Sequence, residues 1–429
     1  MKRRSFIRNI SLGAAATIGV PYLLPTGRLF AATGDRIAKH VVFCLFAGGV
    51  RNLESIEKHD GNLMPYTLKG NEAINSEIID GIEFNEPNTT GSTLQEKGTL
   101  YKDFSFNGMA VHYGAHATAI TGHYTGLTIN TNPQHPTIFE LYRKHNNPAM
   151  PAKNAWWVSD SEGKYAHLNY STHPEYGAEY GANYIQPSSF TDDIKNRNLL
   201  GDPQVYDPAV VKSIRGFCDA NFSTQYNGVA NSIINDEVEK KEIEDFIDEC
   251  FVEAQCDVFD NPWSLPKGIF NSDMKAVHFA ERIIEKFQPR LLVVNMHQAD
   301  IAHIDFTQYA SNLNKMDYAL NHLWDTIEAT EGMSGETILI AMPEHGRNEE
   351  GNGGPPDNYG REPLDHTDLM CKEIFALVVG PVGKVKQGQL SSKARESIDI
   401  VPTIARILGF DHEPGFPHLP GKVMTESFF

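Results

Sequence analysis

Thr337-Ile-Leu-Ile-Ala-Met-Pro-Glu-His-Gly346 is the stretch that decides the fold. Its five consecutive apolar residues, 338–342, are typical of a strand buried on both faces of a parallel sheet. Glu344 and His345 follow at once, and Gly346 permits a tight turn. Ligands of open α/β sheets bind beyond the carboxyl ends of the strands, so this acidic residue and histidine are well placed for chemistry. In isolation, a Glu-His pair would more simply end a strand.

The same alternation of apolar runs and amphipathic segments continues through the chain. Strands are predicted at 40–47, 155–159, 290–296 and 374–380, and helices at 117–121, 136–144, 273–286, 314–326 and 397–409. Residues 52–100 are rich in Asn, Gly and Glu and are expected to be surface connections. Alternating strands and helices predict an α/β fold with a doubly wound, mostly parallel sheet.

The pattern loosens between about residues 160 and 270, where Tyr, Asn, Pro and Gly dominate the first half. Two helices are expected there, around Pro208–Phe222 and Asn235–Cys256. This part is interpreted as an inserted cap region over the core, within a domain that runs from residue 35 to 429.

Composition limits the possible partners. The chain has 429 residues, 41% of them hydrophobic, and a formal net charge of -18. Such acidity argues against a nucleic-acid or anionic-membrane partner. An anionic substrate would need a local positive centre, which a bound metal ion supplies. Alternatively, the acidity only keeps an exported protein soluble.

The N-terminus has the features of an export signal. Arg3-Arg4-Ser-Phe-Ile-Arg8 precedes a weakly apolar segment, residues 10–20, and Ala31-Ala-Thr-Gly34 offers small residues for cleavage. This pattern matches a bacterial twin-arginine signal over residues 1–34 and predicts a periplasmic or extracellular protein. Pro21 and Pro25 interrupt the apolar segment, so no stable membrane span is expected, although retention as an uncleaved anchor is the alternative.

Imidazole and carboxylate side chains follow several of the predicted strands. Asp300 and His303 come after the strand at 290–296, Glu344 and His345 after the strand at 337–342, and His366 in the loop beyond. A single histidine is usually structural, but five such residues at one edge of a sheet predict a divalent metal site. Zinc is the expected ion, with manganese or calcium as alternatives.

The order of these parts resembles that of the alkaline phosphatase/sulfatase superfamily, whose members are two-metal hydrolases of phosphate and sulfate esters. Glu344-His345-Gly346 resembles its Asp-His-Gly metal motif, and Asp300-Ile-Ala-His303 resembles its Asp-x-x-x-His pair, one residue shorter. His366 matches its late metal histidine, and Asp399-Ile-Val-Pro-Thr403 with Leu408-Gly409 resembles its near-terminal helix.

Finer features resemble a twin-arginine-exported branch of sulfatase-like proteins of unknown function. They are Phe46-Ala-Gly-Gly49, His116-Ala-Thr118, Thr121-Gly122, Glu344-His-Gly-Arg347, and Gly360-Arg361 before Asp365-His366. The resemblance covers roughly residues 38–160 and 270–412. It implies an alkaline phosphatase-like sheet.

Two departures from the superfamily pattern bear on mechanism. Gly48 stands where the first strand should end in a metal-binding Asp. His112 stands nine residues before Thr121, where the resemblance places the Thr, Ser or Cys nucleophile. His112 would complete the second metal set as a ligand or would itself be phosphorylated. Otherwise it is an ordinary polar residue in an inactive relative.

The resemblance therefore implies an exported metal-dependent hydrolase of a small anionic ester, of the phosphate or sulfate type. One ion would be held by Asp300, His303 and His366, while Glu344 and His345 would bind a second ion or act as base. The candidate catalytic residues are His112, Glu344 and Arg347, with Arg347 neutralising a substrate oxygen. The candidate metal ligands are Asp300, His303, Glu344, His345, His366 and His112. The alternative is a non-catalytic binding or surface-assembly protein that retains a structural metal.

Overall fold

The computed structural model describes residues 36–89, 91–125, 132–146, 151–160, 168–188, 190, 237–255 and 258–429. The predicted export signal and the helix expected around 208–222 lie outside these residues. Among the helices that are described, none combines the length and apolar character needed to cross a bilayer.

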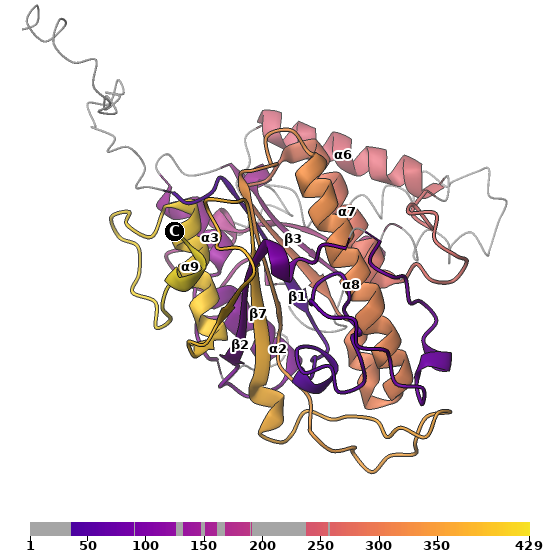
Figure 1. The fold of residues 1–429 in the computed structure, drawn as a ribbon. Helices are drawn as coiled ribbons and strands as arrows, with labels where there is room; N and C mark the ends of the chain where they lie inside the picture. The colour runs from indigo at the N-terminus through magenta and orange to yellow at the C-terminus, as the bar shows by residue number, and fades with distance from the viewer. Residues whose placement is uncertain are drawn as a thin grey trace, which may run out of the picture.

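One mixed sheet forms the centre of the described chain (Figure 1). Its strands are β1 (His40–Phe46), β2 (Gly98–Ser105), β3 (Ala155–Ser159), β4 (Asn183–Ile185), β5 (Leu291–Met296), β6 (Thr337–Pro343), β7 (Glu373–Val379), β8 (Gln389–Ser391) and β9 (Arg395–Glu396). The strand order is β4-β3-β5-β1-β6-β7-β2-β8, and β9 pairs with β2. Strands β4, β3, β5, β1 and β6 run parallel, whereas β7 is antiparallel to both β6 and β2. The predicted α/β fold with a mostly parallel sheet is confirmed.

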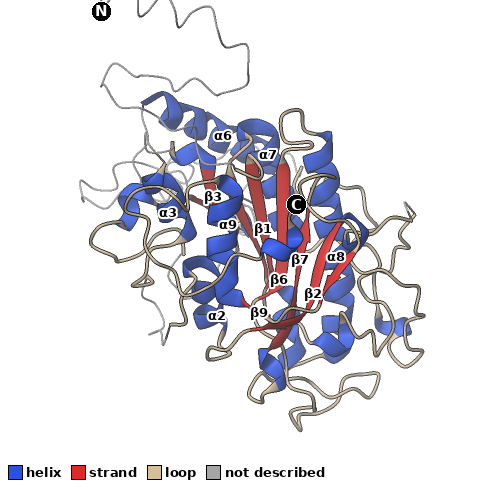
Figure 2. Cartoon of the chain, turned by 60° about the vertical axis from the view of Figure 1, so that its left-hand side comes forward, coloured by secondary structure: helices blue, strands red, loops and turns tan. Residues whose placement is uncertain are grey.

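Helices cover both faces of the sheet (Figure 2). The α-helices are α2 (His112–Thr121), α3 (Ile138–His145), α6 (Glu237–Gln255), α7 (Ser272–Phe287), α8 (Phe306–Ala329) and α9 (Ile400–Leu408). The 3-10 helices are η1 (Asn52–Glu54), η2 (Ile79–Gly81), η3 (Gln95–Lys97), η4 (Ala152–Asn154), η5 (Gly177–Tyr180), η6 (Gln298–His303), η7 (Met370–Lys372), η8 (Ser397–Asp399) and η9 (Thr425–Ser427). Helices α6, α7 and α8 pack on one face, and α2, α3 and α9 on the other.

Strand β1 shows why the central strands are apolar throughout. Val42, Cys44 and Phe46 belong to the core shared with α7 and α8, whereas the alternate residues Val41 and Phe43 belong to the core shared with α2 and α9. Because neighbouring side chains of a strand point to opposite faces, a strand with helices on both sides must be apolar at every position.

Three sequence-based expectations need correction. Residues 52–100 are not merely surface connections, because β2 begins at Gly98 and Leu63 and Met64 are fully buried. Helix α2 begins at His112 rather than at residue 117, and α8 begins at Phe306 rather than at 314. The α8 start was hidden by polar residues, yet Asp305 caps it by accepting a hydrogen bond from the backbone N–H of Gln308.

The expected insertion at 160–270 is described only in part. Its residues 183–185 form β4, which pairs with β3 at the edge of the main sheet. The helix expected at 235–256 is α6, whose Phe246 packs against Trp156 of β3. Its boundaries as a cap region stay a prediction.

Candidate metal centre

The parallel strands β5, β1 and β6 end side by side at one edge of the sheet. Phe46, the last residue of β1, is in register with Met296 of β5 and Pro343 of β6. The chain beyond these three ends carries Gly48, the 3-10 helix η6 and Glu344. Residues far apart in sequence therefore meet at one edge because the strand register places their carboxyl ends together.

Gly48 packs directly against η6. Its φ is +91°, and a Cβ atom there would lie 2.1 Å from the backbone nitrogen of Asp300. The Gly48 N–H donates to Glu344 Oε1 at 2.7 Å. A side chain has no room at this position, so the carboxylate implied by the resemblance would not fit here unless η6 moved.

Glu344 is fully buried and surrounded by histidines. Its Oε1 lies 2.7 Å from His112 Nδ1, and its Oε2 lies 2.5 Å from His116 Nδ1. Burial acts to raise the pKa of Glu344, but His116, His112 and His345 together lower it well below its usual range. Glu344 is therefore ionised.

His112, the first residue of α2, bridges two carboxylates. Its Nδ1 faces Glu344, and its Nε2 lies 3.0 Å from Asp300 Oδ1. Burial acts to lower the pKa of His112, but the two carboxylates raise it to about 10. His112 stands at the position where the resemblance places the nucleophile, and both of its ring nitrogens are in contact with carboxylates.

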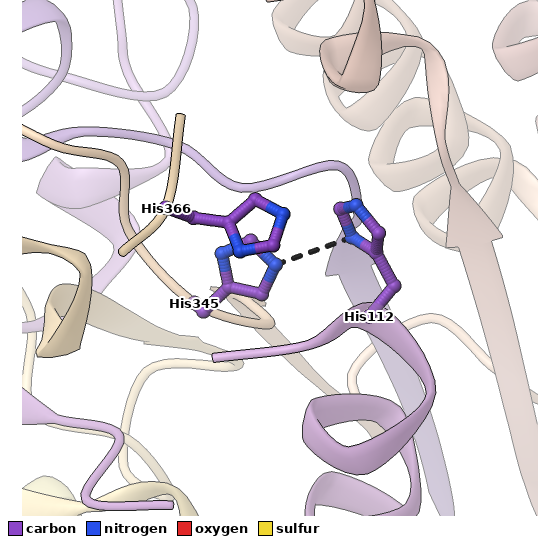
Figure 3. Close-up of side chains that lie close together, drawn as sticks. All are labelled: His112, His345 and His366. Atoms are coloured by element: carbon purple, nitrogen blue, oxygen red, sulfur yellow. Dashed lines mark hydrogen bonds between the residues drawn. The ribbon is translucent and has the colours of Figure 1, made fainter. Parts of the chain in front are cut away.

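Three imidazole rings converge here, those of His112, His345 and His366 (Figure 3). Ring centroids are 4.9 Å apart for His112 and His345, 5.0 Å for His112 and His366, and 4.7 Å for His345 and His366. His345 Nδ1 lies 2.7 Å from the carbonyl oxygen of Gly346, so it carries the proton and leaves Nε2 as a hydrogen-bond acceptor. That Nε2 lies 3.2 Å from His112 Nδ1.

Both His345 and His366 are in the form that binds metal ions. Burial lowers the pKa of His345 to about 3. Burial, and after it the charge of His112, lowers the pKa of His366, so both rings are neutral. His366 Nδ1 is buried and has no hydrogen-bond partner. A buried nitrogen of a neutral imidazole without a hydrogen-bond partner is the kind of ligand that a divalent ion binds.

A more exposed group adjoins these rings. His303 Nε2 lies 3.4 Å from Asp300 Oδ1, and His303 Nδ1 lies 3.6 Å from Asp365 Oδ1. Burial, and after it the charge of Arg347, lowers the pKa of His303 to about 4. Burial acts to raise the pKa of Asp300, but the contact with His112 outweighs burial, so the pKa of Asp300 is lowered. The Asp300 side chain is 50% exposed, so this side of the cluster is open to solvent.

The ligand atoms form three overlapping groups, each with all its atoms within 4.8 Å of one another. The groups are His112, His345 and His366; His112, Asp300 and His303; and His303, Asp365 and His366. The residues present therefore fit a divalent ion by donor type, by proximity and by the neutral state of His303, His345 and His366, whereas His112 would have to lose a proton to bind the ion.

Arg347 is fully buried and bonded to protein oxygens. It donates from Nη1 to the Leu364 carbonyl at 3.0 Å and from Nη2 to Asp300 Oδ1 at 2.9 Å, and it also contacts the carbonyl oxygen of Gly48. In the structure its guanidinium holds Asp300, and its predicted contact with a substrate oxygen stays a prediction.

All six predicted ligands, with Arg347, lie in one cluster, while their roles stay predictions. Sequence reasoning left out Asp365 and His116. Asp365 directly precedes His366, and adjacency of two ligand-type side chains was an available signal. His116 is four residues after His112 in α2, a spacing that places both on the same face of the helix.

Comparison with known proteins adds the following. No protein-family model matches the sequence, and no curated protein matches it either. Among solved structures, this chain is similar to a protein of the alkaline phosphatase superfamily from Vibrio parahaemolyticus, with 12% sequence identity and a TM-score of 0.43 over 95% of this chain and 76% of that one. It is also similar to the sulfatase PsFucS1 from Pseudoalteromonas sp., with 13% identity and a TM-score of 0.43 over 87% of this chain and 68% of that one. A mutant of the alkaline phosphatase PafA has 11% identity and a TM-score of 0.46 over 91% of this chain and 99% of that one. At such identities and scores, these similarities say nothing about the reaction that this chain performs.

Proposed function

We propose that this chain is an exported, metal-dependent hydrolase of small anionic esters of the phosphate or sulfate type. The observation that carries the proposal is the set of three overlapping His/Asp groups at an open edge of the sheet. A merely structural metal site would be closed off from solvent, whereas this cluster runs from fully buried His345 to half-exposed Asp300.

The residues divide into two sets in this proposal. Asp300, His303 and His366 would hold one divalent ion, and Glu344, His345 and His112 would hold a second. The nitrogen-rich donors favour zinc, with manganese or calcium as the alternatives. An ion bound there would supply Lewis-acid chemistry, polarising the ester and making water more acidic.

The protein groups would prepare the site for an anionic ester. Arg347 lies behind Asp300 and adds a buried positive charge to an otherwise acidic molecule. His112 Nδ1 and Nε2 both lie against carboxylates, so water entering from the exposed side of Asp300 is the nucleophile in this proposal. Such hydrolysis needs no covalent intermediate.

The test is a panel of aryl phosphates and aryl sulfates, offered to the purified full chain. We expect hydrolysis that a chelator abolishes and that zinc, manganese or calcium restores. Tight metal binding without hydrolysis of any ester would instead favour the non-catalytic binding or surface-assembly protein.

His112 separates an enzyme from an inactive relative. We expect His112→Ala to lower the amount of bound metal per chain, because it removes an imidazole shared by two ligand groups. Elemental analysis measures this, with His123→Ala as the control, since His123 lies beyond the end of α2 and stacks on His135. Unchanged metal content with lost activity would point to a phosphorylated histidine, and no change in either would point to an inactive protein.

Export is proposed from Arg3 and Arg4 ahead of the weakly apolar segment. Replacing both arginines with lysine should leave the protein in the cytoplasm, as measured by cell fractionation. Normal export of that variant would remove the twin-arginine assignment.

A further inference from the structure

His116 occupies a buried position directly behind Glu344. It is 1% exposed and lies one helical turn after His112 in α2. Its Nδ1 is 2.5 Å from Glu344 Oε2 and 2.7 Å from the carbonyl oxygen of His112. Other polar side chains of α2 bond within their own helix: Thr118 donates to the Gly114 carbonyl and Thr121 to the Ala117 carbonyl. His116 also bonds a carbonyl of its own helix, that of His112, but in addition its ring contacts Glu344 and Asn295 at the ends of the sheet strands.

The second ring nitrogen of His116 continues into a buried polar chain. His116 Nε2 lies 2.9 Å from Asn295 Oδ1, and Asn295 Nδ2 donates to Ser159 Oγ at 3.1 Å. Ser159 Oγ in turn donates to the carbonyl oxygen of Asp160 at 2.9 Å. The chain thus connects α2 to the carboxyl ends of β3 and β5 and, through Glu344, to that of β6.

The directions of these hydrogen bonds follow from one another. Ser159 gives its only proton to Asp160, so its oxygen accepts from the Asn295 amide. The Asn295 carbonyl oxygen is then the atom that faces His116 Nε2, and it needs a donor. His116 Nδ1 donates its proton to the carbonyl oxygen of His112, so both ring nitrogens of His116 are protonated, and Glu344 Oε2 lies beside Nδ1 at 2.5 Å as an ion-pair contact without a hydrogen-bond partner of its own.

We propose that His116 is the positioning residue of Glu344: it holds Oε2 from behind, so that Oε1 alone is turned toward His112 and the candidate metal centre. A buried carboxylate needs a compensating charge, and a histidine protonated on both nitrogens provides it at 2.5 Å from Oε2. Asn295 and Ser159 fix the ring, as the outer partners of metal-site residues do. Metal binding by Glu344 rests on the proposed function, whereas the hydrogen-bond chain itself does not.

The first test measures metal affinity by competition with a chromophoric zinc chelator. Loss of an outer partner typically weakens metal binding 10–100-fold, and we expect about that loss for His116→Ala. Asn295→Ala should weaken binding less, because His116 keeps its contact with Glu344. His123→Ala is the matched control and should bind zinc as the wild type does. The absorption spectrum of the cobalt-substituted His116→Ala protein should also change, since it reports the coordination of the ion rather than overall folding.

The second test needs no metal. In chelator-treated protein with ¹⁵N-labelled histidine, we expect one ring whose two N–H protons both exchange slowly with solvent. Those two signals should vanish in His116→Ala. In Asn295→Ala, the Nε2 proton should exchange faster with solvent, and this variant keeps the test usable if His116→Ala does not fold. A wild type with these signals but no bound metal would refute the proposed function and support this inference. Zinc affinity equal to the wild type in either variant, or absence of the doubly protonated ring, would overturn it.

Discussion

Gly48 lets the chain that follows β1 approach η6 closely. Replacing it with alanine would add a Cβ atom 2.1 Å from the Asp300 nitrogen at a φ of +91°. Left-handed strain costs about 1–2 kcal/mol and overpacking typically about 1–3 kcal/mol. We therefore expect Gly48→Ala to lower the free energy of unfolding by about 2–5 kcal/mol, measured by urea denaturation, and to reduce metal content by displacing Asp300.

Gly383 provides the matched control for that substitution. Its φ is +87°, yet a Cβ atom there would meet nothing within 4 Å. Gly383→Ala should therefore show only the strain of about 1–2 kcal/mol and full metal content. Equal effects of the two substitutions would contradict the claim that Gly48 is required by the contact with η6.

Residues of the candidate site could be predicted from the sequence where they directly follow an apolar strand. Glu344 and His345 end an apolar run, so their place at the sheet edge follows from the sequence alone. His116 could not be assigned in the same way, because its partners Asn295 and Ser159 come from two other strands. The small space beside Gly48 is equally a tertiary property, set by the approach of η6.

The loop from Asn348 to Asp365, which carries the chain from β6 to His366, is held by Arg361. Its Nη1 and Nη2 donate to the two carboxylate oxygens of Asp60 at 2.9 and 3.0 Å, and its guanidinium lies 4.2 Å from the centroid of the Phe306 ring. Asp60 is only 1% exposed, so removing Arg361 leaves this buried carboxylate with only its longer contacts to Asn75 and His59.

We expect Arg361→Met to free this loop and to weaken zinc binding by at most about tenfold, the lower end of the range for losing a direct partner of a metal ligand, because Arg361 acts only through the loop that leads to His366. Hydrogen exchange should become faster in the loop, and mass spectrometry can localise the change. Arg282→Met is the control, because Arg282 pairs with Glu253 at 2.6 Å between α7 and α6 and has no contact with the loop. Unaltered exchange in the loop of Arg361→Met would show that other contacts suffice.

The elements themselves were predicted unevenly, for physical reasons. Long apolar runs identified β1, β5, β6 and β7, because strands covered on both faces are apolar throughout. Strand β2 was missed because Lys102 and Asp103 interrupt its apolar pattern. The antiparallel direction of β7 was not evident either, since strand direction depends on how the connection crosses the sheet.

For the molecule as a whole, buried ionisable groups outside the cluster set how stability varies with pH. His40 is 4% exposed, its Nδ1 lies 2.9 Å from the Pro289 carbonyl, and burial lowers its pKa from 6.5 to about 4. Between these values the unfolded chain binds a proton that the folded chain does not. The contribution of the neutral, buried His40 to the free energy of unfolding is therefore fully present above pH 6.5 and is lost as the pH falls toward 4.

Asp317 has the opposite effect. It is fully buried and accepts hydrogen bonds from the backbone N–H groups of Tyr66 at 2.8 Å and Thr67 at 2.7 Å, and burial raises its pKa from 3.8 to about 7. Here the folded chain holds the extra proton between the two values. The contribution of the protonated, buried Asp317 to the free energy of unfolding is therefore fully present below pH 3.8 and is lost as the pH rises toward 7.

We expect His40→Gln and Asp317→Asn to change the pH dependence of stability in opposite directions. The difference in unfolding free energy between wild type and His40→Gln should grow by up to about 3 kcal/mol from pH 4 to 6.5, because one pKa unit is worth 1.36 kcal/mol. The difference between wild type and Asp317→Asn should shrink over the same range. Urea denaturation of chelator-treated protein at four pH values measures both slopes. Slopes of the same sign would show that burial does not control the protonation of these two residues, since burial disfavours the charged form of each and therefore shifts their pKa values in opposite directions.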